Sequence, residues 1–121
     1  MLIRLSAFNS RLHAQCRSAI KLNACGFAGF DVRTDINIMG AELLRNNKKN
    51  VLPDKKGICT MLSSVDFCAL PGKYGYKWPS LSELHLKLFG KDFENAHDAM
   101  SDISATADCF FALEERSVIS L

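Results

Sequence analysis

The sequence predicts a small α/β protein that is predominantly helical and has few strands. Apolar residues recur at helical spacing over residues 35–45, 79–90 and 98–115, whereas residues 57–62 form a short, partly β-branched apolar run. At 121 residues the chain has the length of one domain. With 48% hydrophobic and 23% charged residues, it is neither a disordered chain nor a collagen-like one.

Hydropathy and charge limit the classes of partner. The longest apolar runs, such as residues 110–113, are too short to span a bilayer, so no membrane partner is expected. The formal net charge of +2 is too small to argue for nucleic acid by itself. The charge is unevenly placed, however, because residues 1–34 are basic and the remainder is acidic.

The cysteine pattern argues against disulfides and zinc. The count is odd and no pair has CxxC spacing, so neither a disulfide framework nor a zinc ribbon is indicated. We expect small buried thiols in a reducing, cytoplasmic location. The cysteines concerned are Cys16, Cys25, Cys59, Cys68 and Cys109.

The N-terminal segment allows three interpretations. Residues 1–30 contain no Asp or Glu and are rich in Arg, Ser and Ala. This composition fits an organelle transit peptide, an ordinary amphipathic helix built on Leu5, Leu12 and Ile20, or a segment foreign to the domain that follows. The regular pattern begins only at Asp35, so we place a boundary between residues 34 and 35.

The first expected helix covers residues 35–45. Asp35 stands at its start, where a carboxylate can cap free backbone N–H groups. The polar run 46–50 ends the pattern. The apolar stripe comprises Ile36, Met39, Gly40 and Leu43.

A strand, a loop and a second helix are expected next. Residues 57–62 have the composition of a strand, and the Gly, Pro and aromatic residues of 70–79 are typical of a loop. Ser80 and Glu83 predict a capping box, and Gly90 predicts the end of the helix. The apolar stripe of this helix comprises Leu81, Leu84 and Leu88, with His85 beside it at the boundary of the core.

The last helix is expected over residues 98–115, with Met100, Ile103, Ala107 and Phe110 facing inward. Asp102 shares another face with Thr106, Cys109 and Leu113, which is mostly uncharged. A carboxylate buried on that face needs a partner, because an unpaired buried charge is costly.

Asp98, Asp102 and His97 are the candidate chemical groups. Asp98 and Asp102 are one turn apart and would repel each other, and a hard cation such as Mg²⁺ would relieve this. A neutral His97 could then take a proton from a metal-bound water. Alternatively, Asp98 is an ordinary N-cap, Asp102 pairs with a Lys or Arg, and His97 is a surface residue.

The order of these segments resembles a known nuclease family. Trp78–Gly90 and Phe93–Asp102, with its His-x-Ala-x-x-Asp pattern, resemble the C-terminal part of DnaQ-like 3′–5′ exonucleases of the DEDDh group. Residues 35–45 are similar to the helix after the second family motif. Residues 58–61 correspond to a family strand. The resemblance therefore covers residues 35–121 and implies an RNase H-like α/β fold, present here as its C-terminal part.

The resemblance also implies a reaction. Members of the family bind two Mg²⁺ or Mn²⁺ ions through four acidic side chains and hydrolyse phosphodiester bonds at the 3′ ends of DNA or RNA. Carried over to this sequence, His97 is the expected general base and Asp102 a metal ligand. Asp35 is the expected acid of the second motif.

Residues 1–34 depart from the family pattern. The first motif is a strand that ends in Asp-x-Glu, and the run 30–34 echoes it only with Arg33 in place of the glutamate. The residues 92–94 match the letters but are expected in a loop. We therefore expect weak or no activity from this chain alone. The missing strands would also leave helix faces exposed, which favours self-association or an assembly in which another chain supplies the acids.

A separate basic and aromatic run is the second candidate for function. It comprises Lys73, Tyr74, Tyr76, Lys77 and Trp78, and contains no acid. Aromatic rings of this kind stack on bases while lysines contact phosphates. The alternative is a loop anchored to the domain by its aromatic rings. If the first holds, the chain could be a catalytically silent module that binds single-stranded nucleic acid or a protein.

Overall fold

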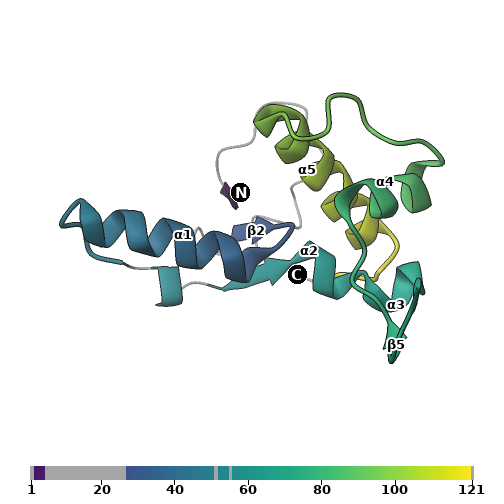
Figure 1. Cartoon of the computed structure of the whole chain (residues 1–121), viewed down its shortest axis with the longest axis horizontal. Coiled ribbons are helices and arrows are strands. Elements are labelled where there is room, and N and C mark those ends of the chain that lie inside the picture. Colours follow the sequence, from purple (N-terminus) through teal and green to yellow (C-terminus); the bar gives the residue numbers. More distant parts are fainter. Residues whose placement is uncertain (1, 5–26, 51, 55, 121) are drawn as a thin grey trace.

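A computed structural model describes residues 2–4, 27–50, 52–54 and 56–120 (Figure 1). The three interpretations of residues 1–30 concern mainly residues 5–26, which lie outside the described part, as do Cys16 and Cys25.

A three-stranded sheet positions the rest of the molecule. β1 (Leu2–Arg4) pairs antiparallel with β2 (Phe27–Gly29), and β2 pairs parallel with β3 (Gly57–Cys59). Parallel neighbours place their carboxyl ends at the same edge. There the carbonyl oxygen of Phe30 accepts a 3.0 Å hydrogen bond from the N–H of Met61 and a 3.2 Å contact from the Cys59 thiol.

α1 (Val32–Arg45) follows β2 and leads, through the short helix η2 (Leu52–Asp54), back to β3. Figure 1 shows α1 projecting away from α4 and α5, with its N-terminal end against the sheet. The helix ends at Arg45 as predicted, but it begins three residues earlier than expected. Asp35 is therefore not the N-cap: it lies in the first turn, because the buried side of the helix already starts with Val32.

The segment after β3 differs from the predicted strand and loop. The strand ends at Cys59, and two short helices follow, α2 (Thr60–Ser63) and α3 (Val65–Cys68). Thr60 and Met61 are buried at this turn. The expected loop contains a hairpin of β4 (Pro71–Gly72) and β5 (Gly75–Tyr76).

α4 (Leu81–Phe89) has the ends that the sequence predicts. The Ser80 hydroxyl accepts a 3.1 Å bond from the N–H of Glu83, and the Glu83 carboxylate accepts a 2.8 Å bond from the N–H of Ser80. Gly90 ends the helix with φ of +71°, a conformation that suits glycine. The capping box is thus confirmed.

α5 (Ala99–Glu115) begins after Asp98, whose carboxylate accepts a 3.1 Å bond from the N–H of Ser101. The alternative of Asp98 as an N-cap is thus borne out. The prediction that Met100 faces inward is wrong, since its side chain is 68% exposed. The first turn of α5 extends beyond the packed body, and burial begins at Ala105.

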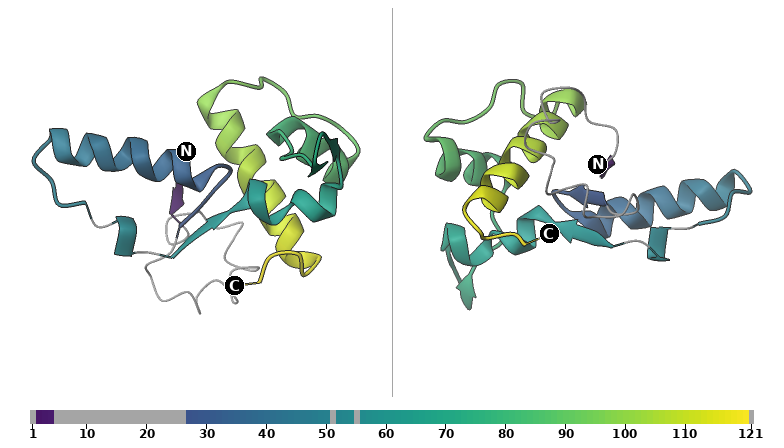
Figure 2. Two further views of the ribbon diagram at one scale, coloured as in Figure 1. Left: turned by 60° about the horizontal axis from the view of Figure 1, so that its bottom comes forward. Right: turned by 180° about the vertical axis from the view of Figure 1, so that it is seen from behind.

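The core lies between α4, α5 and the sheet. Figure 2 shows α4 and α5 together on the side of the molecule away from the tip of α1. Leu84 and Leu113 are fully buried where the two helices meet. Cys68 and Cys109 are buried there as expected. The buried cluster comprises Ala28, Cys68, Leu84, Leu88, Cys109, Phe110, Ala112, Leu113 and Ile119.

The structure is an α/β fold in which helices predominate and strands are few and short, as the sequence predicts. The expected boundary between residues 34 and 35 falls inside α1, and β1 and β2 are hydrogen-bonded into the same sheet as β3. Residues 27–34 are thus part of the same folded unit as the residues that follow. Within the described ranges, no helix has the length and apolar character needed to cross a bilayer.

Candidate functional site

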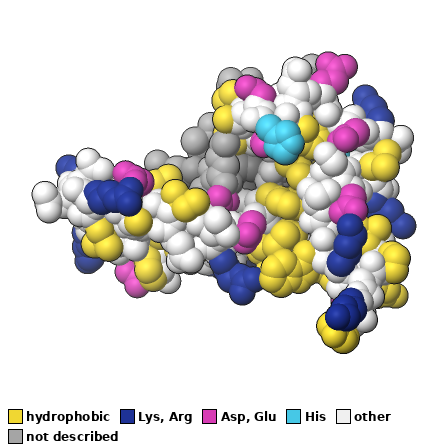
Figure 3. All heavy atoms as spheres, in the orientation of Figure 1, with side chains coloured by type: hydrophobic (Ala, Val, Ile, Leu, Met, Phe, Trp, Pro, Cys, Tyr) yellow, Lys and Arg dark blue, Asp and Glu magenta, His cyan; other side chains and the backbone are white. Residues whose placement is uncertain are grey.

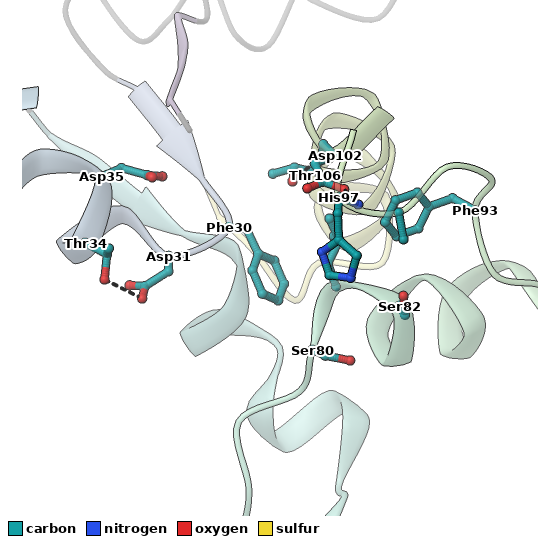
Figure 4. A pocket seen from close by; sticks show the side chains of 12 residues that line it. Phe30, Asp31, Thr34, Asp35, Ser80, Ser82, Phe93, His97, Asp102 and Thr106 are labelled. Carbon is teal, nitrogen blue, oxygen red and sulfur yellow. Dashed lines mark hydrogen bonds between the residues drawn. The ribbon is translucent and has the colours of Figure 1, made fainter. Parts of the chain in front are cut away.

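A cavity of about 440 Å³ lies between the start of α1 on one side and the starts of α4 and α5 on the other (Figure 4). Figure 3 shows this face of the molecule, where acidic side chains border the hollow. The described residues that line the cavity are Phe30, Asp31, Thr34, Asp35, Ser80, Leu81, Ser82, Phe93, Ala96, His97, Asp102 and Thr106.

The cavity lies beyond the carboxyl ends of β2 and β3. In α/β sheets this edge is where ligands usually bind, because loops and helix starts gather there. Phe30 and Asp31 follow β2 directly, and Phe30 is held by the two bonds to its carbonyl oxygen described above. The local fold thus turns Asp31 toward this edge.

The α1 wall carries two carboxylates. Asp31 precedes the helix and Asp35 lies in its first turn, so both line the same side of the cavity (Figure 4). The Thr34 hydroxyl donates a 2.8 Å bond to Oδ2 of Asp31. The other oxygen, Oδ1, is buried and has no hydrogen-bond partner among the described residues. An acceptor in this position is available to a cation or a donor from a ligand.

The opposite wall carries His97 and Asp102. The backbone N–H of His97 donates a 3.2 Å bond to Oδ1 of Asp102. His97 has φ of +75°, a left-handed conformation that is costly for a non-glycine residue. Its imidazole is exposed at the cavity (Figure 4). The carboxylate of Asp102 therefore holds the backbone of His97 in this left-handed conformation.

Asp35, His97 and Asp102, the residues that the nuclease resemblance assigns to the site, all line this one cavity. Figure 4 shows the carboxylates of Asp35 and Asp102 on facing walls, although 67 positions of sequence separate them. Each lies in the first turn of its helix, where the helix dipole stabilises negative charge. No Lys or Arg is among the described residues that line the cavity, so the net charge of this described lining is negative.

The donor set fits a hydrated divalent cation better than one held by protein alone. Within the described part, no three His, Cys, Asp or Glu side chains are grouped closely enough to hold a metal ion. Mg²⁺ typically keeps several waters and takes only one or two carboxylates from a protein. Facing carboxylates with a buried Asp31 Oδ1 suit that mode of binding.

His85 supports the loop between α4 and α5, and its burial agrees with the predicted packing role. Its Nδ1 lies 2.7 Å from the carbonyl oxygen of Lys91, which can only accept, so Nδ1 carries the proton. Its ring contacts Phe89 and Phe93, with centroids 4.6 and 5.5 Å away. Phe93 lines the cavity, so this packing shapes the wall that carries His97.

The basic and aromatic run lies on the β4–β5 hairpin and just after it, outside the cavity. Tyr74, Tyr76 and Trp78 are 91%, 57% and 58% exposed, and Trp78 contacts α1 through the guanidinium of Arg33. The Lys73 ammonium lies 5.1 Å from the centroid of the Tyr74 ring, and Lys77 forms a 2.5 Å ion pair with Glu83.

Asp31 is a residue of the cavity that sequence reasoning did not include. It was set aside because Arg33 occupies the place of the motif glutamate. The signal that could have identified it is its position directly after an apolar segment and before a helix. An acid at the carboxyl end of a parallel strand faces the ligand-binding edge.

No protein-family model, curated protein or solved structure shows significant similarity to this chain.

Proposed function

We propose that the cavity is the site of a metal-dependent 3′–5′ exonuclease, acting on single-stranded ends of DNA or RNA, and that this chain alone is impaired. The proposal rests on the resemblance of residues 35–121 to DnaQ-like exonucleases. The observation that supports it is the gathering of Asp35, His97 and Asp102, from separate parts of the sequence, around one acidic cavity.

Each wall has a defined task in this proposal. Asp35 and Asp102, together with Asp31, hold the divalent cation, which when bound activates water and stabilises the leaving oxygen. His97 takes the proton from the attacking water through its exposed imidazole. The N–H bond to Asp102 keeps this imidazole at the cavity.

The impairment follows from the same side chains. The Asp-x-Glu strand that supplies two acids in the family has no counterpart in the sequence, and the described carboxylates are not gathered into a closed metal site. A clamp with fewer acids holds its cations more weakly, so the transition state is less stabilised.

Hydrolysis of a single strand labelled in its 3′-terminal nucleotide, with Mg²⁺ or Mn²⁺, tests the proposal. We expect slow release of mononucleotides that His97→Ala and Asp102→Asn abolish. Robust release by the unmodified chain would contradict the impairment but not the activity. Mn²⁺ binding measured by titration calorimetry gives an independent check. If Mn²⁺ binding is absent, or is unchanged in Asp31→Asn and Asp102→Asn, the site assignment is wrong.

The exposure of the hairpin rings favours a second candidate function, a silent module that binds single-stranded nucleic acid. Rings that serve as anchors are normally buried, whereas Tyr74 and Trp78 remain in solvent. In a filter-binding assay, Lys73→Ala and Trp78→Ala should weaken binding if the hairpin is the binding surface. Leu86→Ala, an exposed apolar residue on α4, is the control. Equal binding by all variants would exclude the hairpin.

A further inference from the structure

We propose that Arg33 and Trp78 form the binding platform for the nucleotide that precedes the terminal one, in a single strand whose 3′ end occupies the cavity. This inference rests on the proposed function and assigns a role to Arg33, which the resemblance treats only as a departure.

The pair joins two segments whose neighbouring residues line the cavity. The guanidinium carbon of Arg33 is 5.6 Å from the centroid of the Trp78 ring. Arg33 lies on α1 between Asp31 and Thr34, and Trp78 lies two residues before Ser80. Because those neighbours line the cavity from its two sides, the contact between Arg33 and Trp78 connects the two walls, and we place the entry of the strand there.

The exposure of Trp78 leaves room for a base. Its side chain remains 58% exposed although Arg33 lies over it. Bases stack on exposed aromatic faces without regard to sequence, and an arginine beside the ring adds a cation for the adjoining phosphate. The pair therefore offers an aromatic face for the base of one nucleotide and a cation for its phosphate.

The negative charge of the described lining residues favours a cation at the entrance of the cavity. The carboxylates of Asp31, Asp35 and Asp102 line it, and no Lys or Arg is among its described lining residues. A polyanion that approaches this surface is repelled unless positive charge accompanies it. Arg33 supplies that charge next to the carboxylates of α1.

The hairpin extends the platform away from the cavity. The N–H of Lys77 donates a 2.9 Å bond to the carbonyl oxygen of Leu70, so the extended pairing continues past β5. In extended backbone, residues two apart face the same side, which places Tyr76 and Trp78 on one face. The next ring is thus positioned for the next base.

Trp78 is the only tryptophan of the chain, so its fluorescence reports on this platform directly. The test titrates the chain, with Mn²⁺ present, with thymidine 5′-monophosphate and with a thymidine trinucleotide whose phosphorothioate linkages resist hydrolysis. We expect the trinucleotide to quench the fluorescence and the mononucleotide to bind without quenching. Arg33→Ala should weaken trinucleotide binding about tenfold and leave mononucleotide binding unchanged.

Arg45→Ala is the matched control, since it removes an exposed arginine from the other end of the same helix. Equal effects of Arg33→Ala and Arg45→Ala, or equal losses for both ligands, would overturn the proposal. The proposal would also be overturned if the trinucleotide bound without quenching the Trp78 fluorescence. The same holds if the quenching by the trinucleotide were unchanged in Asp102→Asn. A separate measurement shows whether the proposed function itself fails. In that case Mn²⁺ binding is the same in the unmodified chain, in Asp31→Asn and in Asp102→Asn.

Discussion

Oδ1 of Asp102 accepts a 3.2 Å hydrogen bond from the backbone N–H of His97. The bond joins the loop before α5 to the first turn of that helix, where the chain passes through a left-handed conformation. Asp102 therefore has a structural task as well as the chemical one that we propose. The two tasks can be separated by substitution.

Asp102→Asn keeps an oxygen that can accept the His97 N–H, whereas Asp102→Ala removes it. We expect both variants to lose Mn²⁺ affinity, because both lose the negative charge. Only the alanine variant should lose stability, by about 1 kcal/mol, the usual net value of one hydrogen bond. Calorimetric Mn²⁺ titration and urea denaturation measure the two effects. Equal stability of the two variants would show that the bond contributes nothing.

His97→Gly and His97→Ala both remove the imidazole, but they differ at the backbone. At φ of +75° glycine has no steric cost and alanine does. The glycine variant should be more stable than the alanine variant by about 1 kcal/mol, while both lose any hydrolytic activity equally. Urea denaturation of the pair checks this. A more stable alanine variant would contradict the strain at this position.

Leu84 and Leu86 form a matched pair on α4. Leu84 is fully buried against α5, whereas Leu86 is 53% exposed. Leu84→Ala should lower the free energy of unfolding by about 2–5 kcal/mol because it leaves a cavity in the core. Leu86→Ala should change it by less than about 0.5 kcal/mol. Similar losses in thermal denaturation would indicate that the α4–α5 packing is not the main core.

Burial raises the pKa of the Cys109 thiol to about 12, with smaller contributions from Asp108 and Cys68. In the unfolded chain the thiol ionises near its ordinary value of 9.0, so the folded state holds the proton more tightly. The stabilisation is complete below about pH 9 and is lost as the pH rises toward 12. Cys109→Ala should flatten this alkaline loss in urea denaturation. An unchanged slope for Cys109→Ala would contradict the shift.

Sequence reasoning succeeded where the determinants are local. The capping box of Ser80 and Glu83 and the glycine stop at Gly90 are set by residues within one turn, and the structure has both. The Asp98 cap is local in the same way. The expected cap at Asp35 failed because the start of α1 depends on where β2 ends, which is a tertiary matter.

Only part of the candidate site could be predicted from the sequence, because the rest depends on tertiary contacts. The resemblance predicts Asp35, His97 and Asp102, all of which line the cavity, and the last two are close in sequence and joined by a hydrogen bond. Asp31 became a candidate only once β2 was seen to run parallel to β3, which brings it to the edge of the cavity. The contact of Arg33 with Trp78 joins segments that no spacing rule relates.

The parallel pairing of β2 with β3 also has a kinetic consequence. Phe27 must meet Gly57 before β2 and β3 can pair, and the entropy of closing that loop is lost before the contacts compensate for it. The capping box of Ser80 and Glu83, by contrast, joins residues within one turn of α4. We therefore expect the ends of α4 to form early in refolding, whereas Asp31, which directly follows β2, reaches the edge of the cavity only when β2 has paired with β3.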